Sequence, residues 1–229
     1  MAVQVRAQSV QSMFGRIARR YDFANNVLSG GIHLVWRHGL VRAVPSTATV
    51  LDVATGTGGV LALLLHRCRV AVGVDFCLPM LEVGAARGVH NLVCGDGLRL
   101  PFADSTFDAV TVAFGVRNFE DPLAGLRELH RVLKPGGTVH VLEFGQPRNS
   151  LFARVYDSYS RWILPWVGSL VTGDRAAYEY LPETSRLFPC DGAFCELLRQ
   201  AGFVQPESRP LTGGIAYRYR GVVAGNAEL

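Results

Sequence analysis

The residues best suited to bind a small molecule lie in a glycine-rich turn and at the ends of two apolar segments. The first segment contains Asp52 and leads into Gly56, Thr57 and Gly58, and the next segment ends at Asp75. Glycines let a ligand approach the backbone closely, because they have no Cβ atom. A carboxylate at the end of the second segment can accept hydrogen bonds from both hydroxyls of a ribose. The pattern therefore predicts a pocket for a nucleotide-sized cofactor.

The spacing of the glycines separates two kinds of cofactor. A dinucleotide fold uses G-x-G-x-x-G, in which a pyrophosphate rests on the N-terminus of the next helix. Here Leu61 stands in the third glycine position, and Asp52 lies inside the first strand. The motif resembles that of S-adenosylmethionine-dependent methyltransferases. The resemblance implies that the three turn residues line the methionine part of S-adenosylmethionine and that Asp75 binds its ribose. The alternative is a glycine turn without a ligand.

The elements that must position these residues alternate along the chain. Alternating apolar strands and helical patterns are typical of a parallel sheet with helices on both faces. We expect helices at 60–66, 78–87, 122–133 and 192–201, and strands at 49–53, 70–75, 91–94, 107–114, 138–144, 204–211 and 216–223. Ligands bind such sheets beyond the carboxyl ends of the strands. That edge would bring the glycine turn, Asp75, Asp96 and residues 114–118 together.

The third and fourth strands contribute further candidate cofactor contacts. Asp96 and Gly97 follow the third strand, and Ala113 lies near the end of the fourth. By the methyltransferase resemblance, Asp96 accepts the amino group of adenine, Gly97 allows a close backbone approach, and Ala113 contacts the cofactor through its backbone. Taken alone, Asp96 fits a helix cap equally well.

Length and composition predict one domain. The 229 residues are 49% hydrophobic and 18% charged, which suffices for a single α/β core. We expect an N-terminal helical lid at 1–47, a cofactor-binding core at 48–145, and substrate-side helices with C-terminal strands at 146–229. The absence of a signal-peptide pattern predicts a cytoplasmic protein. The net charge of +4 is spread along the chain and does not indicate nucleic acid, and five scattered cysteines predict free thiols and no metal. Nothing in the sequence sets an oligomeric state.

The N-terminal region predicts a cover for the pocket. Apolar residues recur at helical spacing from Val10 to Tyr21, which predicts an amphipathic helix packed against the sheet. Residues 21–36 then place polar and aromatic side chains in a loop before the first strand. We interpret this segment as a lid.

The lid closely resembles the signature of the quinone-biosynthesis C-methyltransferases, the ubiquinone/menaquinone methylase family called UbiE or MenG. The matching lid residues are Tyr21, Asp22, Asn25, Ser29, His33 and Trp36, and further matches lie at 114–118, 131–137, 177–182 and 211–216. Ala24 stands where Met is usual and Gly145 where Ser is usual. The resemblance spans about residues 10–221. It implies a class I methyltransferase, a Rossmann-like α/β fold whose seven-stranded, mostly parallel sheet carries helices on both faces and an N-terminal helical lid.

The resemblance also implies a reaction, in which S-adenosylmethionine methylates a ring carbon of a prenylated hydroquinone. The carbon becomes nucleophilic when a ring hydroxyl loses its proton, so the site must align the reactants, take up the proton and stabilise the phenolate, with no metal. The expected acceptor is demethylmenaquinol, and the alternative is 2-methoxy-6-polyprenyl-1,4-benzoquinol of ubiquinone synthesis. Other classes are a nucleic-acid or protein N-methyltransferase, whose Asn/Asp-Pro-Pro-Tyr motif residues 114–117 lack, and a non-catalytic cofactor-binding module.

Candidate catalytic residues come from the lid and from the end of the fourth strand. We expect Arg117 to hold the phenolate, with Asn118 beside it as a hydrogen-bond donor. The alternative is a surface Arg117 that pairs with Glu120 or Asp121. The candidates for the proton acceptor are His33, whose unperturbed pKa is roughly 6.5, and then Asp22 and Tyr21.

Two segments of the last third bear on the substrate. Residues 162–167, preceded by Arg154 and Arg161, form either a patch at a membrane surface or a helix buried against the lid. The apolar run 162–171 is too short to span a bilayer, which takes roughly 20 residues. Tyr178 and Tyr180 are two positions apart and would point in different directions, so we expect only one to face the substrate.

Overall fold

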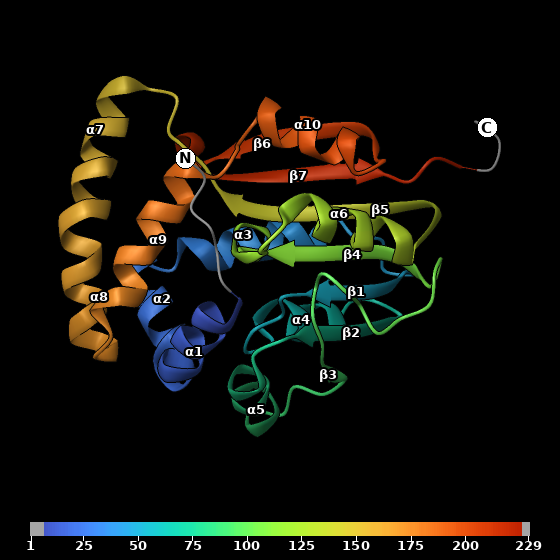
Figure 1. Cartoon of the computed structure of the whole chain (residues 1–229), viewed down its shortest axis with the longest axis horizontal. Coiled ribbons are helices and arrows are strands. Elements are labelled where there is room, and N and C mark those ends of the chain that lie inside the picture. The colour runs from blue at the N-terminus through green and yellow to red at the C-terminus, as the bar shows by residue number, and fades with distance from the viewer. Residues whose placement is uncertain (1–6, 226–229) are drawn as a thin grey trace.

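The computed structural model describes residues 7–225 and contains a mixed sheet with the strand order β3-β2-β1-β4-β5-β7-β6 (Figure 1). Strands β1 to β5 run parallel, whereas β7 is antiparallel to β5 and β6 is antiparallel to β7. This confirms the seven-stranded, mostly parallel sheet, although β5 begins at Leu133 rather than at residue 138. The strands are β1 (Thr49–Val53), β2 (Val70–Asp75), β3 (Leu92–Cys94), β4 (Phe107–Ala113), β5 (Leu133–Phe144), β6 (Val204–Leu211) and β7 (Ala216–Val222).

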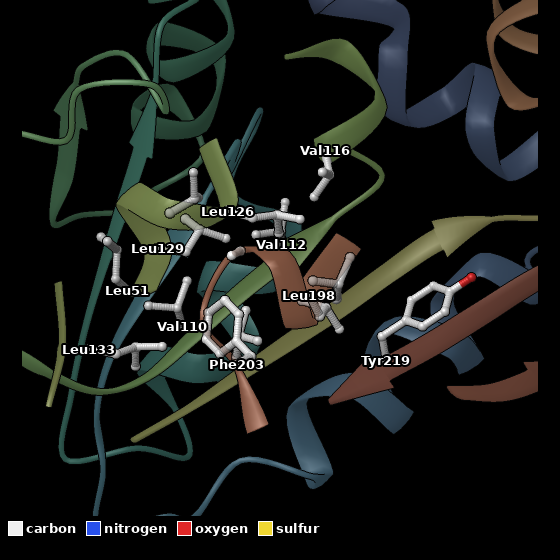
Figure 2. Close-up of a cluster of buried hydrophobic side chains, with 14 of the residues drawn as sticks. Leu51, Val110, Val112, Val116, Leu126, Leu129, Leu133, Leu198, Phe203 and Tyr219 are labelled. Carbon is white, nitrogen blue, oxygen red and sulfur yellow. The ribbon is translucent and has the colours of Figure 1, made fainter. Parts of the chain in front are cut away.

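Helices cover both faces of the sheet. On one face α3 and α4 pack around Val50 and Ala109, and on the other α6 and α10 pack around Leu51 and Val110. Figure 2 shows the second of these clusters, which surrounds Val110. The helices are α1 (Ala7–Ile17), α2 (Tyr21–Ser29), α3 (Ile32–Arg42), α4 (Gly59–Leu65), α5 (Leu78–Ala86), α6 (Pro122–Val132), α7 (Ser150–Ser158), α8 (Leu164–Thr172), α9 (Arg175–Leu187) and α10 (Gly192–Gln200).

The register of the central strands sets where a ligand can bind. Val53 at the end of β1 lies opposite Val74 of β2 and Val112 of β4. The carboxyl ends of these three strands are therefore level, and the turns that follow them meet at one edge of the sheet, as expected for an open α/β sheet.

The N-terminal lid is helical, and the prediction of a loop at residues 21–36 was wrong. Helices α2 and α3 occupy this segment and are separated by Gly30 and Gly31, whose φ angles are 57° and 80°. The left-handed Gly30 ends α2 because its N–H bonds back to the carbonyls of Asn26 and Val27. The amphipathic helix α1 is present as predicted, but it packs against α5 rather than against the sheet.

A second group of helices closes the other side of the lid. Helix α7 continues through a π-helical turn at Tyr159–Ile163 into α8, and α9 then packs against α8. Figure 1 shows α7 and α8 as a column on the left, outside α9 and far from the sheet. No helix within residues 7–225 is long and apolar enough to cross a membrane.

Candidate active site

A cleft at the carboxyl edge of the sheet brings together most of the predicted cofactor residues. Gly56, Asp75, Asp96, Gly97 and Ala113 all line it. The carboxylate of Asp75 accepts backbone hydrogen bonds of 2.8 Å from Gly56 and 2.8 Å from Cys77, one on each oxygen. Burial raises the pKa of Asp75, and backbone N–H groups oppose that rise. Each carboxylate oxygen keeps one further acceptor site, which fits the two hydroxyls of a ribose.

The backbone turns sharply where β1 and β4 enter this cleft. Ala54 and Phe114 have φ angles of 53° and 58°, a left-handed conformation that is rare for residues with a Cβ atom. The neighbouring Gly115 is required by packing, because a Cβ atom there would lie 2.5 Å from the Cβ of Ala54. Such strain is typical of binding sites. Sequence reasoning missed Ala54, since nothing about an alanine signals a positive φ.

Asp52, Thr57 and Gly58 support the cleft from beneath instead of lining it. Asp52 accepts hydrogen bonds from the hydroxyls of Thr55 at 2.7 Å and Thr111 at 2.6 Å. Burial raises the pKa of Asp52 to about 6. Gly58 has a φ of 79° at the start of α4. These residues therefore hold the turn in place, and Gly56 is the member of the turn that reaches the cleft.

The lid is attached to the cofactor turn through Asp22. Its carboxylate accepts a hydrogen bond of 2.7 Å from the hydroxyl of Thr57 and forms an ion pair with Arg87. Asp22 does not line either large cavity of the described chain, whereas the adjacent Tyr21 lines both. The structure thus places Asp22 where it can join the lid to the turn, and Tyr21 where it can contact two ligands.

A larger cavity of about 690 Å³ lies between the lid, the ends of β4 and β5, and helices α7 to α9. Phe14, Tyr21 and Phe114 line both this cavity and the cofactor cleft, so the two spaces adjoin. Its wall is rich in aromatic side chains. Those that line only the larger cavity are Trp36, Phe144, Tyr156, Tyr159, Tyr178 and Tyr180.

Arg117 brings a buried positive charge to the wall of the larger cavity. Its guanidinium donates to Glu143 at 2.7 Å and to the carbonyl of Phe114 at 2.6 Å, and it lies 5.2 Å from the centre of the Phe144 ring. The predicted alternative of a surface arginine paired with Glu120 or Asp121 was wrong, because both Arg117 and Glu143 are buried. The buried Nε of Arg117 has no partner among residues 7–225. Arg117 thus brings its charge to the cavity wall, while its unpaired Nε is enclosed by protein.

Glu143 is a residue to which sequence reasoning gave no role. It belongs to a segment that matches the family motif, but its partner is 26 positions away in the chain. The carboxylate also accepts the backbone N–H groups of Arg117 and Phe144. Glu143 therefore positions Arg117, because a buried charge is held by its partners.

His33 lies in the wall of the larger cavity. Its Nδ1 is 2.6 Å from the hydroxyl of Ser29, whose oxygen is also 2.7 Å from the carbonyl of Asn25. In the tautomer in which Ser29 donates to that carbonyl, Nδ1 carries the proton and Nε2 is left as an acceptor. Burial, with Arg37 nearby, lowers the pKa of His33 to about 4. The imidazole is thus neutral and only weakly basic at neutral pH.

Asn118, Tyr178 and Tyr180 complete the comparison with the predicted site. The side-chain amide of Asn118 donates to the carbonyl of Phe114 at 3.4 Å and accepts from the hydroxyl of Tyr180 at 3.2 Å. Asn118 lines the cofactor cleft rather than the larger cavity. Both tyrosines line the larger cavity. Within residues 7–225, no three His, Cys, Asp or Glu side chains are grouped to hold a metal.

The lowered pKa of His33 allows its buried environment to be tested. In the unfolded chain the imidazole of His33 is protonated below about pH 6.5, whereas in the folded protein it is protonated only near pH 4. The free energy of unfolding therefore decreases as the pH falls through this window. We expect His33→Asn to remove about 2 kcal/mol of that loss at pH 5. Urea denaturation of both proteins at pH 7.5 and pH 5 measures the difference. The raised pKa of Asp52 changes the stability with pH in the opposite direction, but it does so equally in both proteins and cancels in the difference.

The exposed His38 provides the control for this experiment. His38→Asn makes the same substitution at a histidine whose side chain is exposed. An equal effect of the two substitutions would contradict the buried, neutral state of His33.

The chain is similar to known methyltransferases over nearly its whole length. The model of the ubiE/COQ5 methyltransferase family matches residues 2–223. The chain is 44% identical to the ubiquinone/menaquinone biosynthesis C-methyltransferase UbiE of Bdellovibrio bacteriovorus, over 93% of this chain and 95% of the relative. It is 42% identical to the demethylmenaquinone methyltransferase of Corynebacterium kroppenstedtii, over 93% of each.

Solved structures share the fold. The cyclase SpnF matches with a TM-score of 0.69 at 17% identity, over 99% of this chain and 100% of that one. A methyltransferase from Thermotoga maritima matches with a TM-score of 0.67 at 20% identity, over 92% of this chain and 98% of that one. At this identity the likeness concerns the fold alone, which is that of class I methyltransferases.

Proposed function

Because the chain belongs to the ubiE/COQ5 methyltransferase family, we propose that it converts demethylmenaquinol to menaquinol. The observation that carries the proposal is the aromatic cavity that adjoins the cofactor cleft and has the buried Arg117 in its wall. An aromatic wall suits a flat hydroquinone ring, and a fixed cation suits the phenolate that the reaction requires.

S-adenosylmethionine supplies the methyl group from its sulfonium when it is bound. Asp75 would hold its ribose, Gly56 would allow the backbone to approach its methionine part, and Asp96 would accept the adenine amino group. The residues present therefore fit this cofactor. Tyr21 and Phe114 lie in the walls of both spaces and would set the direction from which the acceptor ring approaches.

Arg117 would lower the pKa of the ring hydroxyl of the acceptor, and the proton of this hydroxyl would pass to solvent water. A permanent positive charge in a site screened from water stabilises a phenolate, and so raises the electron density on the ring carbon ortho to it. His33 would accept a hydrogen bond from a ring hydroxyl at Nε2. With a pKa of about 4, its imidazole is too weak a base to ionise a phenol unaided. Glu143 would keep the guanidinium in place.

The naphthoquinol is the acceptor that we favour. The two relatives described above carry different names, yet methylation in menaquinone synthesis is common to both. The benzoquinol of ubiquinone synthesis is the second candidate, because the name of the Bdellovibrio relative includes it. Either acceptor carries a long prenyl tail that resides in a bilayer. We therefore place the working enzyme in the cytoplasm, at the inner face of the cell membrane.

An assay with labelled S-adenosylmethionine and short-tailed quinols tests the proposed acceptor. We expect label in the naphthoquinol, with slower or no transfer to the benzoquinol. Transfer to the benzoquinol alone would reverse our choice of acceptor. Tight cofactor binding without transfer to either quinol would instead favour a non-catalytic cofactor-binding module.

A further inference from the structure

The column formed by α7, the π-helical turn and α8 carries an apolar stripe on its outer side. Five side chains make up this outer stripe, with exposed fractions between 62% and 75%. They are Leu151, Val155, Trp162, Trp166 and Leu170. Soluble proteins seldom expose so many large apolar groups side by side. The opposite side of the column faces the larger cavity through Tyr156, Tyr159 and Leu164.

The π-helical turn keeps the two halves of the outer stripe on one side. Leu170 follows Leu151 by 19 residues, which in a regular α-helix is five turns plus about 100°. A π turn accommodates one additional residue and so takes up that rotation. Pro165 explains why the π turn lies at this point of the column. Proline has no N–H to donate to the carbonyl of Arg161, and in a regular α-helix its ring would clash with that carbonyl.

Charge and neighbouring apolar groups extend this surface. Arg154 and Arg161 are exposed on the column, and its single acidic residue, Asp157, lines the cavity and pairs with Arg161 at 3.4 Å, so the column keeps a net positive charge. At the far end of α8, Arg20 donates to the carbonyl of Val171. Helix α2 packs against α8, and it exposes Phe23 and Val27. Arginine and tryptophan together are typical of segments that lie at the headgroup level of a bilayer.

The larger cavity reaches the same column from inside. Ala153 and Arg154 of α7 line it together with Ser185 and Arg186 of α9. Arg154 and Arg186 are exposed, so the cavity approaches the surface between α7 and α9. A membrane resting on the outer stripe would lie against α7, the helix that forms one side of this opening.

We propose that the outer stripe docks onto the surface of an anionic lipid bilayer, with the α7–α8 column lying in the plane of the headgroups. The column is roughly 35 Å long and too polar on its inner side to cross the bilayer. The tryptophans insert among the headgroups and the arginines meet lipid phosphates. The further claim that a quinol tail then passes between α7 and α9 into the cavity rests on the proposed function, whereas docking itself does not.

Flotation of the whole protein with lipid vesicles tests the docking. We expect it to float with vesicles containing about one third phosphatidylglycerol, less with pure phosphatidylcholine, and less at high salt. Burial of a large apolar side chain contributes about 1.5 kcal/mol or more, which is about tenfold in partitioning. Trp162→Ala combined with Trp166→Ala should therefore lower partitioning about 100-fold. Val70→Ala and Leu78→Ala, exposed apolar residues outside the column, serve as matched controls.

Two further measurements separate docking from folding and from catalysis. The double variant should retain cofactor binding by calorimetry and turnover of a short-tailed, water-soluble quinol, because neither tryptophan lines a cavity. Its turnover of a long-tailed quinol embedded in vesicles should fall about as much as its partitioning. Equal flotation of the variant and the unaltered protein would overturn the proposal. So would light scattering that finds a dimer held together by these tryptophans, since the stripe would then be covered by a second copy. Loss of methyl transfer with preserved flotation would count against the proposed function alone.

Discussion

Replacing Asp75 by Asn is expected to raise the dissociation constant for S-adenosylmethionine about 100-fold. The carboxylate already accepts one backbone N–H on each oxygen, so its two remaining acceptor sites are the ones that face a ribose. An amide loses one oxygen and places its NH₂ against a backbone donor. Each hydrogen bond to a charged group contributes about 1.5–3 kcal/mol, and 1.4 kcal/mol is about tenfold in affinity. Isothermal titration calorimetry measures the change.

Asp96→Asn provides a matched control for Asp75→Asn. Asp96 accepts the N–H of Leu98 at 2.9 Å through one oxygen, and an asparagine can make the same bond with its carbonyl group. The same carbonyl oxygen has a second lone pair for the adenine amino group, so we expect the effect on cofactor affinity to stay within about threefold. Thermal denaturation should show that both variants are folded. Equal losses of affinity would contradict the special position of Asp75 at the end of β2.

Replacing Arg117 by Gln is expected to lower kcat about 100- to 1000-fold, the usual effect of removing a group that stabilises developing negative charge. Cofactor affinity should change little, because Arg117 does not line the cofactor cleft. The same substitution leaves Glu143 buried without its cation, which costs about 3–5 kcal/mol of stability. Single-turnover assays with labelled cofactor and urea denaturation measure the two effects separately.

A double variant distinguishes the two roles of Arg117. In Arg117→Gln with Glu143→Gln the buried charges are removed together, so most of the lost stability should return while kcat stays low. Glu143→Gln alone retains the cation but loosens its position, and we expect an intermediate kcat with reduced stability. Recovery of turnover in the double variant would mean that Arg117 serves only as the partner of Glu143.

Several features of this protein follow from local sequence. The bounds of β1, β2 and β6 agree with the strands predicted at 49–53, 70–75 and 204–211. The cofactor residues Gly56, Asp75 and Asp96 were predicted to meet, because parallel strands carry the residues that follow them to the same edge of a sheet. Tyr21 brings the lid segment to the wall of the cleft at this edge, but the predicted conformation of the segment was wrong. Its polar residues suggested a loop, and the pair Gly30-Gly31 proved to be the turn between two helices.

The sequence by itself thus determined the sheet, the cofactor and several residues that line the cofactor cleft, because each depends on spacing within a short stretch of chain. Only the tertiary structure decided how they work together. Arg117 and Glu143 meet because β4 and β5 are neighbours, His33 becomes acidic because it is buried, and Trp162 and Trp166 stay exposed because α9 lies behind their column. Contacts between distant segments set burial and charge pairing, and no local pattern records which segments will touch.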